Sequence, residues 1–191
     1  MKRKSLSLAV TAALLGGAAS VNGAMHVNDR GLGEALIYPF FSAANGNDTY
    51  VHVVNTTDYV KAVKVRFIEA RNSQEVLDFN LYLSPDDEWA AAITANPEGE
   101  GALVRTIDNS CTVPALGTPN GGGEFDGYIV EEADGDIQRN QPFVNFRYDV
   151  AGEADRGLGR TLEGYVEIIE MGQLDPEVGV KGPAAVHDES G

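Results

Sequence analysis

The chain has 191 residues, of which 43% are hydrophobic, and a formal net charge of −15 at pH 7. This length is sufficient for one domain with a sizeable hydrophobic core. The negative charge excludes nucleic acid and anionic lipid surfaces as expected partners, because both bind through basic contacts, and it is compatible with cationic partners, divalent ions or simple solubility.

The first 24 residues have the order of regions that is typical of a secretory signal peptide. A basic start at Met1–Lys4 is followed by an apolar run from Leu6 to Ala19 and by the small-residue segment Ser20–Ala24. The apolar run is about 14 residues long, shorter than the roughly 20 residues that a membrane-spanning helix needs. We therefore expect residues 1–24 to be cleaved and the mature chain, with no membrane span, to be exported to the periplasm or the cell surface of a Gram-negative bacterium.

The first half of the mature chain alternates apolar and polar residues with a period of two, which is the signal of half-buried strands. Pro39 places the first strand at a sheet edge or ends it. Asn, Asp, Gly and Ser clusters separate the strands as turns, and several short strands with regular turn signals are typical of a sandwich. The expected strands cover Ala35–Tyr38, Thr49–Val54, Ala62–Ile68 and Val76–Leu83.

The second half of the chain is less regular. The segment Ser84–Trp89 fits either a helix start or a turn before a strand, and we favour a strand over Trp89–Thr94 because the meander needs a return there. Another strand is expected at Gly101–Thr106 and a last one at Gly164–Met171, with a long acidic loop region over about 108–160 between them. Short strands at Gly127–Val130 and Phe143–Tyr148 are alternatives within that loop. The expected domain therefore spans 25–172, and 173–191 form a flexible tail or the start of a missing segment.

Several motifs in the first half also resemble a group of uncharacterised exported proteobacterial proteins and, more generally, immunoglobulin-like sandwich modules of bacterial surface proteins. They are Gly31–Gly33, Leu36–Phe40, Asn47–Thr49, Val54–Thr57, Val63–Phe67 and Val76–Pro85. These motifs are structural, so the resemblance implies a fold and a compartment and no activity.

No constellation of residues indicates an enzyme. The histidines, His26, His52 and His187, are scattered and offer neither a nucleophile–base pair nor a zinc-ligand spacing. Cys111 follows Asp108, and an acidic neighbour disfavours a reactive thiolate, so we expect a buried structural thiol. Whether Cys111 is free or bridged stays open, because one cysteine in an exported chain is an odd number.

Acidic residues between 124 and 140 form the one candidate metal site. Calcium binds hard oxygen ligands from flexible loops that contain glycine, and the carboxylates of Asp126, Asp134 and Asp136 surround such turns. The pattern of an EF-hand loop is not met, and an exposed acidic loop without a metal is the alternative.

The sequence therefore predicts an all-β, immunoglobulin-like antiparallel β-sandwich with a long acidic loop region. The aromatic residues Tyr38, Phe40, Phe41 and Trp89 are expected to close its core, although the first three could also form an exposed patch. We expect a non-enzymatic surface or periplasmic module for adhesion, assembly or envelope scaffolding that binds a protein or glycan. The alternative is a calcium-stabilised carbohydrate- or ligand-binding domain.

Overall fold

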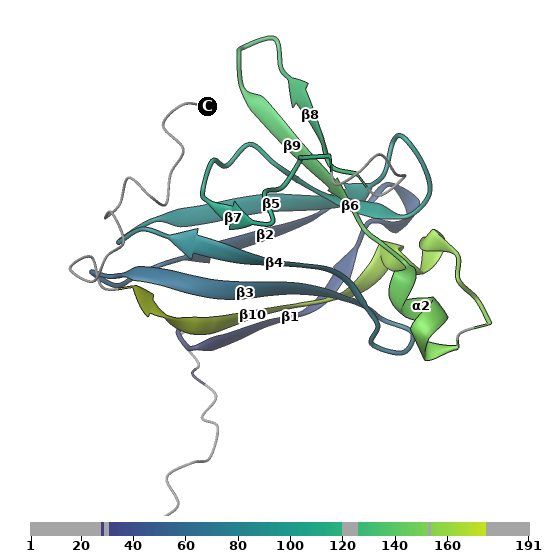
Figure 1. Cartoon of the computed structure of the whole chain (residues 1–191), viewed down its shortest axis with the longest axis horizontal. Helices are drawn as coiled ribbons and strands as arrows, with labels where there is room; N and C mark the ends of the chain where they lie inside the picture. Colours follow the sequence, from purple (N-terminus) through teal and green to yellow (C-terminus); the bar gives the residue numbers. More distant parts are fainter. Residues whose placement is uncertain (1–27, 29–30, 120–125, 153, 175–191) are drawn as a thin grey trace, which may run out of the picture. The chain divides into compact units, whose positions relative to one another are not determined.

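A computed structural model describes residue 28 and residues 31–119, 126–152 and 154–174. The domain that begins at Glu34 consists of two five-stranded sheets that pack face to face (Figure 1). The strand order is β1-β10-β3-β4-β7 in the first sheet and β2-β5-β6-β9-β8 in the second. Every neighbouring pair is antiparallel. The prediction of an all-β antiparallel sandwich is therefore confirmed.

The strands are unequal in length, and the two shortest lie at sheet edges. The first sheet contains β1 (Ala35–Ser42), β3 (Val60–Glu69), β4 (Glu75–Leu83), β7 (Thr112–Val113) and β10 (Glu163–Leu174). The second contains β2 (Thr49–Val54), β5 (Glu88–Ala95), β6 (Ala102–Thr106), β8 (Tyr128–Glu131) and β9 (Ile137–Pro142). The helical segments are η1 (Ala44–Gly46), α2 (Phe146–Ala151) and η2 (Leu158–Leu162).

Strand β3 shows how the alternating sequence forms the sheet. Its residues Val65 and Phe67 are fully buried, whereas Lys64 and Arg66 point outward between strands β4 and β10. Arg66 donates to Glu167 of β10 at 2.8 Å, and Lys64 forms an ion pair with Asp78 of β4. The cations of the central strand are thus neutralised by acids on both neighbouring strands.

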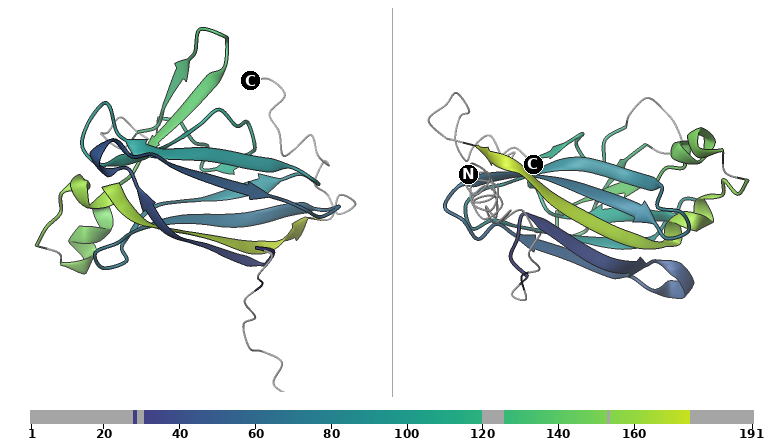
Figure 2. Two further views of the ribbon diagram at one scale, coloured as in Figure 1. Left: turned by 180° about the vertical axis from the view of Figure 1, so that it is seen from behind. Right: turned by 90° about the horizontal axis from the view of Figure 1, so that it is seen from below.

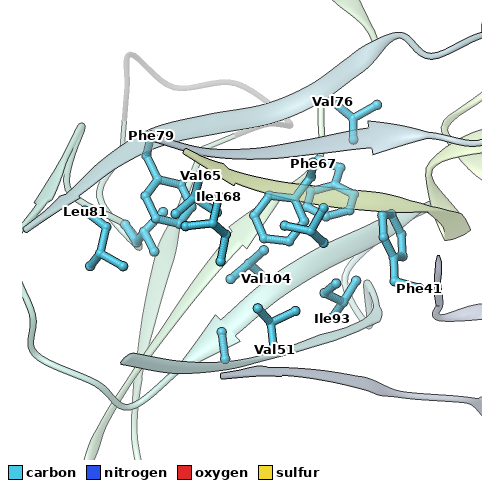
Figure 3. Packing of buried hydrophobic residues seen from close by; sticks show 14 of the residues in the cluster. Phe41, Val51, Val65, Phe67, Val76, Phe79, Leu81, Ile93, Val104 and Ile168 are labelled. Carbon is cyan, nitrogen blue, oxygen red and sulfur yellow. The ribbon is translucent and has the colours of Figure 1, made fainter. Parts of the chain in front are cut away.

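Aromatic rings of the first sheet, from Phe41, Phe67 and Phe79, pack in the core against residues of the second sheet such as Val51, Ile93 and Val104 (Figure 3). Phe67 of the first sheet lies with its ring centroid 5.2 Å from that of Phe143, and Phe41 lies 5.9 Å from the same ring. At the other end of the core, Trp89 of β5 packs against Phe79 of β4 at 5.7 Å. Trp89 therefore lies on a strand and in the core, as predicted.

The region 108–160 differs from the prediction of a long loop. Its described residues contain β7, β8, β9 and the helix α2, and β8 (Tyr128–Glu131) confirms the alternative of a short strand at about Gly127–Val130. Strand β8 lacks the alternation of buried and exposed residues that predicts a half-buried strand, because the adjacent residues Ile129 and Val130 are both exposed. The tip of the hairpin β8–β9 projects from the body of the sandwich (Figures 1 and 2), whereas the end of β9, from Asn140 onward, pairs with β6 and is buried.

Two further expectations differ from the structure: a strand at Phe143–Tyr148 and the end of the domain at 172. The segment Phe143–Tyr148 leads into α2 rather than forming a strand, and the buried residues Phe143 and Tyr148 are separated by the exposed Phe146. Strand β10 continues to Leu174, two residues beyond the expected end of the domain at 172. The predicted signal peptide at 1–24 and the tail from 175 onward lie outside the described residues.

Candidate functional site

A cleft of about 540 Å³ opens beside the β3–β4 turn. It is formed by this turn, by η1 and by the segment that leads into η2 and β10. Polar and charged side chains alternate there with small residues. The lining residues are Ala44, Glu69, Ala70, Arg71, Asp155, Gly157, Gly159, Arg160, Leu162 and Glu163.

Glu69 lies at the base of this cleft and is completely buried. It is the last residue of β3, so its carboxylate faces the turn that follows. The backbone N–H groups of Arg71, Asn72 and Gln74 donate to it at 2.8, 3.1 and 3.2 Å. Arg160 adds an ion pair at 3.0 Å. Glu69 thus binds the donors of the β3–β4 turn, which would otherwise be left without partners.

These contacts also set the protonation of Glu69. Burial alone would raise the pKa of its carboxyl group, but the three backbone donors and Arg160 together outweigh burial and hold the pKa below its ordinary value. The group is therefore an anchored carboxylate and is unsuited to act as a proton donor near neutral pH.

Arg160 connects this turn to the rest of the cleft. Its Nη2 also donates to Asn72 Oδ1 at 2.6 Å, and its Nη1 donates to the backbone oxygen of Asp155 at 2.7 Å. The guanidinium carbon lies 4.2 Å from the ring centroid of Tyr148 in α2. One side chain therefore ties together the β3–β4 turn, α2 and the segment before β10.

The outer part of the cleft carries a second ion pair, between Arg71 and Asp155. The Gly157 N–H donates to Asp155 at 3.1 Å, and this bond together with Arg71 lowers the pKa of the Asp155 carboxyl group. Glu69 and Asp155 thus each have a basic partner, and no serine or cysteine lines the cleft. The arrangement stabilises the fold.

The sequence analysis did not identify Glu69 and Arg160. A weak signal exists, because Glu69 ends an alternating strand just before the turn residues Asn72 and Ser73. The partner Arg160 is 91 residues away in the chain. No local pattern pairs two residues at that separation.

The structure does not bring the three predicted calcium ligands together. Asp134 and Asp136 lie in the turn of the β8–β9 hairpin, where the Asp136 N–H donates to Asp134 Oδ1 at 3.3 Å. Asp126 precedes β8, so the length of that strand, on the order of 15 Å with its flanks, separates it from the other two. Calcium needs its oxygens about 2.4 Å from one ion. Within the described part of the chain, no group of three acidic, histidine or cysteine side chains could hold a metal.

The other residues singled out in the sequence have separate places. His52 is exposed on β2 and lies 3.0 Å from Glu88. Cys111 is a free cysteine of intermediate exposure, so the expectation of a fully buried thiol is wrong. Phe41 is in the core, whereas Phe40 is 60% exposed. Tyr38 is partly buried against the core, so the aromatic residues Tyr38, Phe40 and Phe41 are divided between core and surface.

The edge strands β1 and β2 each have a feature that hinders a further strand from pairing with them. The Glu170 N–H donates to the Glu34 backbone oxygen at 2.7 Å. By the alternation of an antiparallel ladder, the backbone groups of Ile37 and Pro39 then face the open edge of β1. Pro39 has no N–H and lies in a bulge. On β2, the outward backbone oxygen of His52 accepts the Tyr38 hydroxyl. Each edge thus has one feature that hinders pairing along part of its length.

Comparison with known protein families, curated proteins and solved structures finds no match to this chain. No helix among the described residues is long and apolar enough to cross a membrane.

Proposed function

We propose that this protein is a non-enzymatic β-sandwich module of the cell envelope that works by protein–protein association, in adhesion, assembly or scaffolding. The proposal depends mainly on one observation, a group of exposed apolar side chains on the neighbouring strands β1 and β10. The signal-like residues 1–24 supply the compartment, and the acidic charge of the chain disfavours nucleic acid and anionic membrane surfaces.

The apolar group, called here the β1–β10 patch, comprises Ile37 and Phe40 of β1 and Ile169 and Met171 of β10. Ile37 is 66% exposed and Ile169 is 38% exposed. Ala35 pairs directly with Ile169, and Ile37 pairs with Glu167, so Ile37 and Ile169 are diagonal neighbours on the outer face of the sheet.

Charged residues border this patch. On the same outer face, Arg66 pairs with Glu167 and with Glu75, and Lys64 pairs with Asp78. An apolar centre with a rim of paired charges is the usual anatomy of a protein interface. The patch therefore favours association with a protein over binding of a small molecule.

Site-specific photo-crosslinking in living cells tests this proposal. A photoreactive amino acid is placed at Ile37 or Ile169 in the full chain, and at Ile107 as a control, because Ile107 is 60% exposed and lies outside the patch. We expect discrete protein adducts from positions 37 and 169 in the envelope fraction, and none from position 107. Recovery of the protein in the cytoplasm, or the absence of adducts from both patch positions, would overturn the proposal.

A further inference from the structure

The four edge strands of the sandwich, β1, β2, β7 and β8, differ in how they are protected. Strand β1 has Pro39 and a bulge, and β2 has the Tyr38 hydroxyl bound to its outward backbone oxygen. Strand β7 is two residues long and is followed directly by Pro114. Strand β8 has no proline, no lysine and no bulge, and its register with β9 is regular from Tyr128 to Glu131. Among the described edge strands, β8 is therefore the one without a proline, a bulge or a side chain bonded to its outward backbone oxygens; it is four residues long and carries the charged Glu131.

The free backbone groups of β8 can be assigned from its hydrogen bonds. The Glu132 N–H donates to the Asp136 backbone oxygen at 2.9 Å, in line with the register of the two strands. In an antiparallel ladder the residues that bond to the partner strand alternate with those that face away. Ile129 and Glu131 therefore present their N–H and C=O groups to the open edge.

The side chains around this edge have a consistent chemistry. Ile129 is 55% exposed and Val130 is 38% exposed, and as adjacent strand residues they point to opposite faces of the projecting hairpin. Four exposed carboxylates follow within six residues. None of them forms an ion pair with a basic side chain in the described part of the chain. These carboxylates belong to Glu131, Glu132, Asp134 and Asp136.

We propose that the open edge of β8 binds an extended, basic segment of a partner protein, which adds to the hairpin as a third strand. Main-chain hydrogen bonds to Ile129 and Glu131 would hold the segment, and its apolar side chains would cover Ile129 and Val130. Its lysines or arginines would lie beside the acidic turn. This surface is separate from the β1–β10 patch, so the proposed function and this inference can fail independently.

The charge of the β8 edge favours a basic segment of a partner over a second copy of the chain. A second copy of the chain carries the same net charge of −15 and the same acidic turn, so pairing of two β8 edges brings like charges together. The hairpin contains one basic residue, Arg139, which donates to the Asp108 backbone oxygen at 3.2 Å. A basic segment is therefore complementary where a second copy is not.

A capped six-residue peptide of alternating lysine and valine is the probe for this edge. It is titrated into the ¹⁵N-labelled mature chain (from Met25) at low ionic strength, alongside a peptide of alternating glutamate and valine. We expect amide shift changes centred on Ile129, Val130 and Glu131 with the lysine peptide alone. No shift changes at millimolar peptide, or changes centred on β1 or β2, would overturn the proposal.

Two variants distinguish strand addition from loose attraction between charges. Ile129→Pro removes one outward N–H that β9 does not use, and should weaken binding at least about tenfold while the hairpin is retained. E132K/D134K should weaken binding at least about fivefold. The pair D48K/D58K makes the same change in net charge at exposed sites elsewhere and should weaken it less than about twofold. Equal losses in the two charge variants, or unchanged binding by the Ile129→Pro chain with its other amide signals intact, would overturn the inference.

Discussion

The body of the sandwich and the β8–β9 hairpin differ in how far their strand edges and turns are covered by the protein's own groups. In the body, open edges and turns are closed internally, by the Tyr38 hydroxyl on β2 and by the Glu69 carboxylate at the β3–β4 turn. In the hairpin, β8 ends the sheet, and its residues Ile129 and Val130 are exposed. The contrast indicates that stability is concentrated in the body and that the hairpin is available for recognition.

The largest loss of stability is expected where the body is most tightly closed, at Glu69. Glu69→Gln leaves the buried Arg160 without its counter-charge and places an amide N–H₂ against backbone donors. Removing one partner of a buried ion pair costs about 3–5 kcal/mol. We expect a fall of about 3 kcal/mol in the free energy of unfolding, equivalent to about 10 °C in Tm, measured by urea and thermal unfolding.

Glu163→Gln is the matched control for this change. Glu163 lines the same cleft but is exposed, so its replacement should alter the free energy of unfolding by less than about 0.5 kcal/mol. Equal effects of the two substitutions would show that Glu69 does not anchor the turn.

The second prediction concerns the pH dependence of the same anchor. The pKa of Glu69 is lower in the folded protein than its ordinary value. Its contribution is therefore fully present above the unfolded value of about 4.3 and is lost as the pH falls through the folded pKa. The difference in the free energy of unfolding between wild type and Glu69→Gln should be constant from pH 7 to 5 and shrink below about pH 4. An undiminished difference at pH 3 would contradict this assignment.

The contrast between body and hairpin also explains what the sequence could predict. Strand β3 was predictable because Val65 and Phe67 alternate with Lys64 and Arg66 across one buried face. The strand β8 was predicted only as an alternative at Gly127–Val130, because its adjacent residues Ile129 and Val130 are both exposed and show no alternation of burial. The insertion of β10 between β1 and β3 depends on pairing between distant segments, which a period of two does not encode. For the same reason, the pairing of Glu69 with Arg160 could not be predicted from the sequence. The acidic turn was predicted, but within the described residues it does not bring three metal ligands together.

A smaller effect is expected at the closed edges of β1 and β2. Tyr38→Phe removes the hydroxyl that donates to the His52 backbone oxygen and leaves the ring in place. A hydrogen bond of this kind contributes about 1 kcal/mol, so the free energy of unfolding should fall by about that amount. Hydrogen exchange at the amides of β1 and β2 should become faster, because the edge of β2 would then be uncovered like that of β8. Tyr59→Phe, at an exposed tyrosine in the β2–β3 connection, is the control, and equal exchange rates in both variants would contradict the proposed closure.

The smallest effect is expected in the hairpin itself. Ile129→Ser replaces a side chain that is 55% exposed at an open edge, so the free energy of unfolding should change by less than about 0.5 kcal/mol. Ile93→Ser is the matched comparison, since Ile93 lies on β5 of the same sheet and is fully buried. Its replacement leaves a cavity and buries a hydroxyl, and should cost about 3 kcal/mol or more. Urea unfolding of both variants measures the difference. A loss above about 1.5 kcal/mol for Ile129→Ser would mean that the folded chain already covers this side chain, and the hairpin would then belong energetically to the body rather than to a binding surface.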